Sequence, residues 1–161
     1  MTDGNGNQTR FLYNGDGQCT GVTVRRTDTD GIMRDYTSVY TYDAAGNIQT
    51  CTSPDGKVTA YEYDYRNNQT AVITPDGKRT QYTYDNQDNL TGVSYPDGTS
   101  ESFVYDANQN VTAATSRVGI TVYYEYDSLN RLVKKTYADG TQESYTYDAN
   151  GNCNTKLYQC E

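Results

Sequence analysis

The sequence predicts an all-β protein made of tandem β-hairpins, and three observations lead to this prediction. A Tyr-Asp pair recurs six times at an unbroken interval of 21 residues, from Tyr42-Asp43 to Tyr147-Asp148. Another aromatic residue stands two positions before each of these tyrosines. Turn sequences rich in asparagine, aspartate and glycine separate the short β-prone segments. A repeat of 21 residues holds two strands of about six residues and two tight turns, which leaves no room for a helix.

The first strand of each repeat ends in the pattern aromatic-x-Tyr-Asp. Because side chains alternate along a strand, both rings lie on one face. We expect an inward-facing aromatic ladder in place of an aliphatic core, since tyrosine supplies 18 of the 161 residues. The alternative is that the rings form a stacking platform for sugars. The ladder consists of Tyr40, Tyr42, Tyr61, Tyr63, Tyr82, Tyr84, Phe103, Tyr105, Tyr124, Tyr126, Tyr145 and Tyr147.

Two kinds of turn connect the predicted strands. One follows each Tyr-Asp pair, in stretches such as "AAGN" and "NQDN" whose residues suit reverse turns. The other is Pro-Asp-Gly or Ala-Asp-Gly and leads into the next aromatic strand. Hairpins joined by such short turns lie side by side and antiparallel, because a parallel arrangement needs a long crossover. The predicted turn residues are Gly46, Asn47, Asp55, Gly56, Asp76, Gly77, Asp97, Gly98, Asp139 and Gly140.

We expect one repeat array over residues 1–161, with a degenerate first repeat at about 5–35 and regular repeats at about 36–161. Tyr13 and Tyr42 are 29 residues apart instead of 21, so the hairpin at 22–37 should have longer arms. At about 3.3 Å per residue, its tip would project roughly 13 Å beyond its neighbours. This hairpin is either a tolerated surface insertion or a recognition finger. The residues of such a finger are Arg25, Arg26, Asp30, Gly31 and Arg34.

Composition argues against several classes of function. The chain has no histidine, which removes the commonest general base and the commonest metal ligand. We therefore expect no enzyme, no catalytic residue, no metal and no cofactor. The formal net charge is −8 and basic residues never cluster beyond pairs, so nucleic acid is not an expected partner. No apolar run approaches the roughly 20 residues of a membrane helix, so no membrane span is expected.

The cysteines and the glycosylation sequons add little to these expectations. Cys19, Cys51, Cys153 and Cys160 form no C-x-x-C pair, so neither a zinc site nor a redox motif is indicated and any disulfide pairing stays unassigned. Four Asn-x-Thr sequons begin at Asn7, Asn68, Asn89 and Asn110, and three of them follow from the repeated turn sequence. Turn chemistry is therefore the interpretation that we favour over glycosylation.

The stretches "YEYDYRNNQTAVITPDG" and "YTYDNQDNLTGVSYPDGT" resemble the YD repeats of the Rhs family, whose relatives include toxin-complex cocoon proteins and teneurins. The resemblance runs from about Gly6 to Tyr158. It implies a continuous antiparallel β-ribbon that curves spirally into a hollow, solenoid-like shell, of which this chain would be a partial arc. In that family the shell encloses a toxic C-terminal polypeptide or carries adhesion domains at a cell surface. The family's aspartyl autoproteolytic site has no counterpart before "KLYQCE", so self-cleavage is not assigned to any residue.

These observations predict a structural module, a wall segment of an Rhs-like secreted or surface protein of bacteria. The expected partners are the remainder of a parent shell protein and an encapsulated toxin polypeptide. A second copy of the chain, bound head to tail through exposed strand edges, is another expected partner. The alternative function is a carbohydrate-binding or adhesion repeat, whose partners would be glycans.

Overall fold

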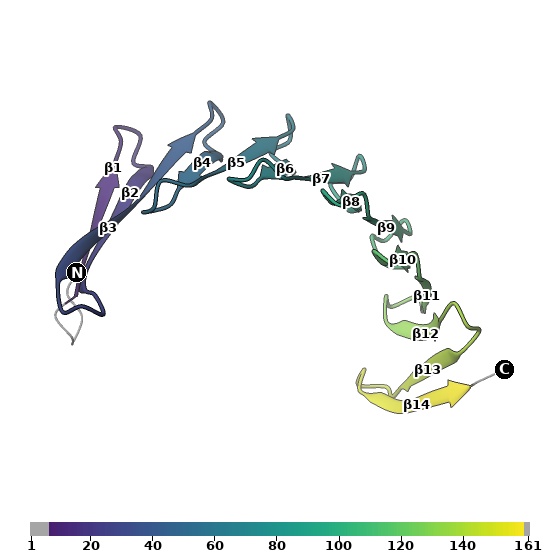
Figure 1. Ribbon diagram of the computed structural model, residues 1–161. Helices are drawn as coiled ribbons and strands as arrows, with labels where there is room; N and C mark the ends of the chain where they lie inside the picture. The colour runs from purple at the N-terminus through teal and green to yellow at the C-terminus, as the bar shows by residue number, and fades with distance from the viewer. Residues whose placement is uncertain (1–6, 160–161) are drawn as a thin grey trace. The chain divides into compact units, whose positions relative to one another are not determined.

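The computed structural model describes residues 7–159 and consists of β-strands joined by tight turns (Figure 1). The chain divides into two compact units, Met1–Thr80 and Gln81–Glu161. Within each unit, neighbouring strands are consecutive in the chain and antiparallel. The predicted all-β hairpin array is confirmed.

The strands of each unit are short, as the repeat length requires. The first unit contains β1 (Gln8–Tyr13), β2 (Cys19–Thr27), β3 (Met33–Tyr42), β4 (Ile48–Thr52), β5 (Val58–Tyr63), β6 (Gln69–Ile73) and the start of β7 (Arg79–Tyr84). The second unit continues with β8 (Leu90–Ser94), β9 (Ser100–Tyr105), β10 (Val111–Thr115), β11 (Thr121–Tyr126), β12 (Leu132–Thr136), β13 (Gln142–Tyr147) and β14 (Cys153–Gln159).

A β-bulge marks every Tyr-Asp hairpin. In the β3–β4 pair, Tyr42 faces Ile48 while the preceding Thr41 faces Thr50, so Gln49 is an extra residue on β4. The same register shift recurs in the other Tyr-Asp hairpins and in the β1–β2 hairpin, where Asn14 follows Tyr13. The pairs joined by the second kind of turn, such as β4–β5, have a regular register. Bulges bend the strand and strengthen its twist. Each repeat therefore alternates one bulged hairpin with one regular hairpin.

The Tyr-Asp turns place one residue in the left-handed region, directly before the recurring Asn or Arg. In the Asp43 turn this residue is Gly46, with φ of 91°. Four later turns use other residues at this position: Asn67, Asp88, Gln109 and Asn130, with φ of 69°, 63°, 66° and 58°. Asparagine and aspartate tolerate this conformation, but glutamine does so poorly. The turn at Gln109 therefore carries the largest backbone cost of the four.

Replacing Gln109 by glycine should stabilise the second unit by up to about 1 kcal/mol, because relief of the left-handed strain exceeds the added chain entropy. Denaturant unfolding would measure the change. Asn67→Gly is the matched control and should not stabilise, since the Asn67 side-chain oxygen accepts a 2.8 Å hydrogen bond from the Asn47 amide. A similar gain at both positions would contradict this account.

The two faces of the sheet differ in chemistry. The tyrosine face carries the aromatic ladder, and all twelve of its rings are half-buried. The opposite face is more polar and carries the Arg79–Glu62 ion pair as well as exposed apolar side chains such as Val104 and Tyr123. Cross-strand threonine pairs also lie there, such as Thr23–Thr37 and Thr41–Thr50, joined by hydroxyl hydrogen bonds of 2.9 and 2.6 Å. Among the described residues, only Ala71 and Val93 are buried apolar side chains. The ladder is thus a half-buried core on one face of a single layer of strands.

Candidate functional site

The second tyrosine of several ladder pairs is hydrogen-bonded to the backbone of the preceding hairpin. The hydroxyl of Tyr105 donates to the Leu90 carbonyl at 2.8 Å, and the hydroxyl of Tyr126 donates to the Val111 carbonyl at 3.0 Å. Tyr42 and Tyr147 make the equivalent bonds at 2.7 Å, to the carbonyls of Cys19 and Leu132. Each accepting carbonyl belongs to the first residue of an even-numbered strand. The hydroxyl groups therefore link successive hairpins of the array.

Burial changes the acidity of the ladder. Desolvation raises the pKa of Tyr63, Tyr105 and Tyr126 above the ordinary tyrosine value, because the phenolate form is disfavoured away from water. Neutral hydroxyl groups are the form that can donate to the backbone carbonyls. The ladder is therefore a packing and hydrogen-bonding device at neutral pH.

The Tyr-Asp turns are organised by the aspartate side chain. In the first regular turn, Asp43 accepts hydrogen bonds from the backbone amides of Ala45 and Asn47 at 2.9 Å and from the Asn47 side-chain amide at 3.1 Å. These bonds lower the pKa of Asp43, and the backbone amide of Asn47 makes the largest contribution. The predicted turn residues Gly46 and Asn47 therefore lie in one bonded unit with this carboxylate.

The second kind of turn uses its aspartate differently. Lys57 and Lys78 lie 2.7 and 2.6 Å from Asp55 and Asp76, and these ammonium groups lower the pKa of both carboxyl groups to about 2. Asp97 and Asp139 instead accept bonds from the following threonine. The glycines that complete these turns, Gly56, Gly77, Gly98 and Gly140, all have positive φ.

The three sequons of the repeated turns are engaged in these same contacts. The amide nitrogens of Asn68, Asn89 and Asn110 donate to the aspartate four residues earlier, at 3.2, 3.0 and 3.0 Å. Glycosylation would replace one of the two hydrogens on this nitrogen and place a sugar in the turn. The geometry supports the interpretation of these sequons as turn chemistry.

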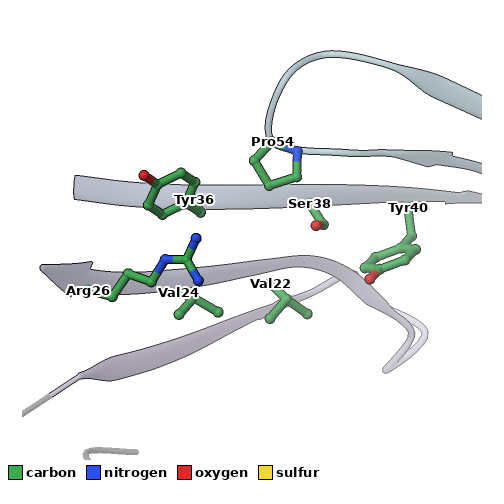
Figure 2. Close-up of a pocket in the computed structure, with 7 residues that line it drawn as sticks. All are labelled: Val22, Val24, Arg26, Tyr36, Ser38, Tyr40 and Pro54. Carbon is green, nitrogen blue, oxygen red and sulfur yellow. The ribbon is translucent and has the colours of Figure 1, made fainter. Parts of the chain in front are cut away.

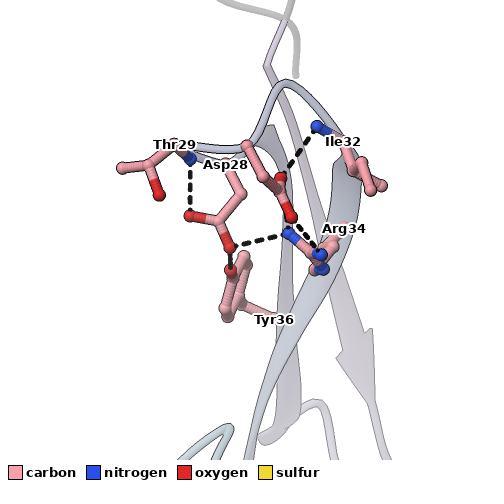
Figure 3. A network of polar contacts seen from close by, with 6 residues as sticks. Asp28, Thr29, Ile32, Arg34 and Tyr36 are labelled. Atoms are coloured by element: carbon pink, nitrogen blue, oxygen red, sulfur yellow. Dashed lines mark hydrogen bonds and ion pairs between the residues drawn. The ribbon is translucent and has the colours of Figure 1, made fainter.

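The long hairpin β2–β3 ends in a network of charged side chains (Figure 3). Arg34 pairs with Asp28 at 3.0 Å and with Asp30 at 2.5 Å, and the Tyr36 hydroxyl donates to Asp28 at 2.5 Å. The Tyr36 bond is the largest cause of the lowered pKa of Asp28, and Arg34 is the largest cause for Asp30. Asp30 also accepts from the Ile32 amide at 3.0 Å, while Gly31 provides the positive φ of the turn. The tip is therefore held in one conformation by its own side chains.

The two adjacent arginines of β2 lie on opposite faces of this hairpin. Arg25 lies opposite Asp35 in the register and pairs with it at 3.6 Å. Arg26 stacks on the Tyr36 ring, with its guanidinium carbon 4.5 Å from the ring centre. On the Arg26 side, side chains of β2 and β3 together with Pro54 line a pocket of about 280 Å³ on the face of the hairpin (Figure 2). The five predicted finger residues thus divide into a tip network, an exposed ion pair and one arginine at a pocket.

Sequence reasoning missed a second polar cluster, on the tyrosine face of the second unit. Glu143 is only 7% exposed and accepts hydrogen bonds from the hydroxyls of Tyr137, at 2.9 Å, and of Tyr145. The pair Tyr95 and Glu101 repeats this contact at 3.0 Å two repeats earlier. The available signal was the spacing of 42 residues between the two Tyr-x5-Glu stretches.

Cysteine pairing, metal-ligating clusters and membrane-spanning helices can be assessed for the described residues. Within residues 7–159, Cys19 and Cys51 are half-buried free thiols, and Cys160 lies outside the described residues. The same range holds no group of three or more potential metal-ligating His, Cys, Asp or Glu side chains. Nor does that range include a helix of the length and apolar character that a membrane crossing demands.

The repeat unit described above matches the model of a known protein family. The family model described as RHS Repeat matches residues 42–79, 63–100, 105–142 and 126–158. The chain belongs to the RHS repeat family. No curated protein matches the chain in sequence.

Solved structures share the fold of this RHS repeat chain at low sequence identity. The crystal structure of TcdB2-TccC3-Cdc42 is 17% identical with a TM-score of 0.54, covering 94% of this chain and 11% of that one. The Tc holotoxin pore of Photorhabdus luminescens is 11% identical with a TM-score of 0.61, covering 88% of this chain and 10% of that one. The RHS repeat chain thus spans about a tenth of the length of these structures.

Proposed function

We propose that this RHS repeat chain is a wall segment of a larger secreted or surface protein of bacteria, whose shell encapsulates a toxin polypeptide or displays effector domains. The chain is a structural module in this proposal and has no catalytic role. The observation that carries it is the use of the ladder hydroxyls, since Tyr42, Tyr105, Tyr126 and Tyr147 each donate to a backbone carbonyl. Such rings join hairpins to one another and are poorly placed to serve as a free binding platform.

The size of the natural gene product tests this proposal. An antibody against this segment should detect, in the producing cells, a polypeptide several times longer than 161 residues. Limited proteolysis of that product should leave any enclosed cargo intact until the shell is denatured. A product of about this size, with no cargo, would contradict the wall segment and favour self-association or adhesion.

A carbohydrate-binding or adhesion repeat is the second candidate, and exposed aromatic rings favour it. Tyr65 is 86% exposed in a Tyr-Asp turn and Tyr123 is 56% exposed on the face opposite the ladder. Exposed rings of this kind can stack on sugars. A glycan array, repeated with Tyr65→Ala, would reveal binding that depends on this ring. Absence of any glycan signal would exclude this candidate for the glycans on the array.

A further inference from the structure

The pocket beside the long hairpin has walls of opposite character (Figure 2). Val22 of β2, Tyr40 of β3 and Pro54 of the following turn form its apolar end. At the other end, the guanidinium of Arg26 lies between the Tyr36 ring and the Val24 side chain, and both of these residues also line the pocket. One compact pocket thus joins an apolar surface to a cation.

Arg26 differs from the other arginines of the long hairpin in having no carboxylate partner. Arg25 pairs with Asp35, and Arg34 pairs with Asp28 and Asp30. Arg26 forms no ion pair with any residue in the described range 7–159. The Tyr36 ring covers one face of the guanidinium, and the Tyr36 hydroxyl takes up part of its N–H edge. A guanidinium has five N–H groups, so the others are left for another acceptor. The chain has 21 acidic and 13 basic residues, so most cations have a carboxylate within reach, and Arg26 is an exception within this hairpin.

We propose that this pocket binds a carboxylate attached to a compact apolar body. The carboxylate accepts charge-assisted hydrogen bonds from Arg26, with the Ser38 hydroxyl as a neighbouring donor. The apolar body lies against Val22, Tyr40 and Pro54. The volume of about 280 Å³ falls just below the roughly 300–1,000 Å³ range of pockets for drug-sized ligands, so it suits one apolar side chain. The ligand is either a free apolar acid or the C-terminal residue of a polypeptide. This proposal does not depend on the proposed function of the chain as part of a shell wall.

The first experiment compares two probes that differ only in charge. N-acetyl-leucine carries both required groups, whereas N-acetyl-leucine amide keeps the apolar body and lacks the carboxylate. In an NMR titration, the acid should shift the backbone amide signals of Val22, Ser38 and Tyr40 in a saturable way, and the amide should bind roughly tenfold more weakly or not at all. Equal binding of the two probes, or no saturable shift with the acid, would overturn the proposal.

Charge-matched variants then locate the site. Arg26→Gln should weaken binding of N-acetyl-leucine by about tenfold or more, since it removes the anchoring guanidinium. Arg25→Gln removes the same charge from the opposite face, one residue away, and should change binding less than about twofold. Equal losses would mean that the acid senses only the general charge of the hairpin, and the pocket would be rejected.

A third variant tests the cavity without changing the charge. Ser38→Leu fills the space between Val22 and Tyr40 and should abolish saturable binding, while circular dichroism confirms that the strands remain. Unchanged affinity in this variant would show that the ligand lies elsewhere. The affinity of the peptide N-acetyl-Gly-Gly-Leu distinguishes the two sources of the ligand. Tighter binding of this peptide than of N-acetyl-leucine supports a polypeptide C-terminus, and equal binding of the two supports a free acid.

Discussion

Replacing Tyr105 by alanine should lower the free energy of unfolding of the second unit by about 3 kcal/mol. The variant loses a half-buried ring that faces Val111 across the β9–β10 pair, and it loses the 2.8 Å hydrogen bond to the Leu90 carbonyl. Truncation of enclosed aromatic side chains to alanine costs about 3–5 kcal/mol, and a half-buried ring belongs at the lower end of that range. Chemical denaturation, followed by circular dichroism, measures the difference.

Two further variants separate the ring from its hydroxyl group. Tyr105→Phe keeps the ring and should cost about 1 kcal/mol, the usual contribution of one neutral hydrogen bond. Tyr123→Ala removes a ring that is 56% exposed on the opposite face of β11, and it should cost less than about 0.5 kcal/mol. If the alanine variants at positions 105 and 123 were equally mild, the ladder would not be the core of the array.

The hairpins could be predicted from sequence because each repeat contains the turn sequences that mark the ends of its strands. Asp97-Gly98 and Tyr105-Asp106 occur at constant spacing, and both turn types have strong local preferences that act within a few residues. The alternation of Tyr82 and Tyr84 with the polar Thr83 also placed both rings on one face before any packing was known. Local chemistry of this kind requires no knowledge of distant contacts.

Features that depend on register could not be predicted in the same way. The extra residue Gln49 becomes a bulge only because Tyr42 pairs with Ile48, and nothing in the local sequence specifies that pairing. Glutamine at position 109 gives no local signal for a left-handed conformation, although the turn imposes one. Arg25 and Arg26 look alike in the sequence, but the strand pleat separates them. The pocket also needs Pro54, which belongs to a turn 28 residues after Arg26.

The ladder and the turns together predict a stability profile that falls at both extremes of pH. On the acid side, hydrogen bonds from Asn47 and Asn110 lower the pKa of Asp43 and Asp106 in the folded state. Their stabilising contribution is therefore present above the ordinary aspartate value of 3.8 and is lost as the pH falls through the folded pKa. Asp106→Asn should reduce this acid dependence, as measured by denaturant unfolding at a series of pH values.

On the alkaline side, the tyrosine ladder should destabilise the fold above pH 10. Burial raises the folded-state pKa of Tyr63, Tyr105 and Tyr126 above the ordinary value of 10.0, so the folded chain retains protons that the unfolded chain releases. Their contribution is fully present below pH 10 and is lost as the pH rises through the folded pKa. Tyr126→Phe should reduce the slope with which the free energy of unfolding falls above pH 10, even though it lowers that free energy at neutral pH. Tyr123→Phe is the control, because it removes one exposed hydroxyl. A free energy of unfolding that stays level well above pH 10, or an equal change of slope in both variants, would show that the ladder hydroxyls are not held in the protonated state by burial.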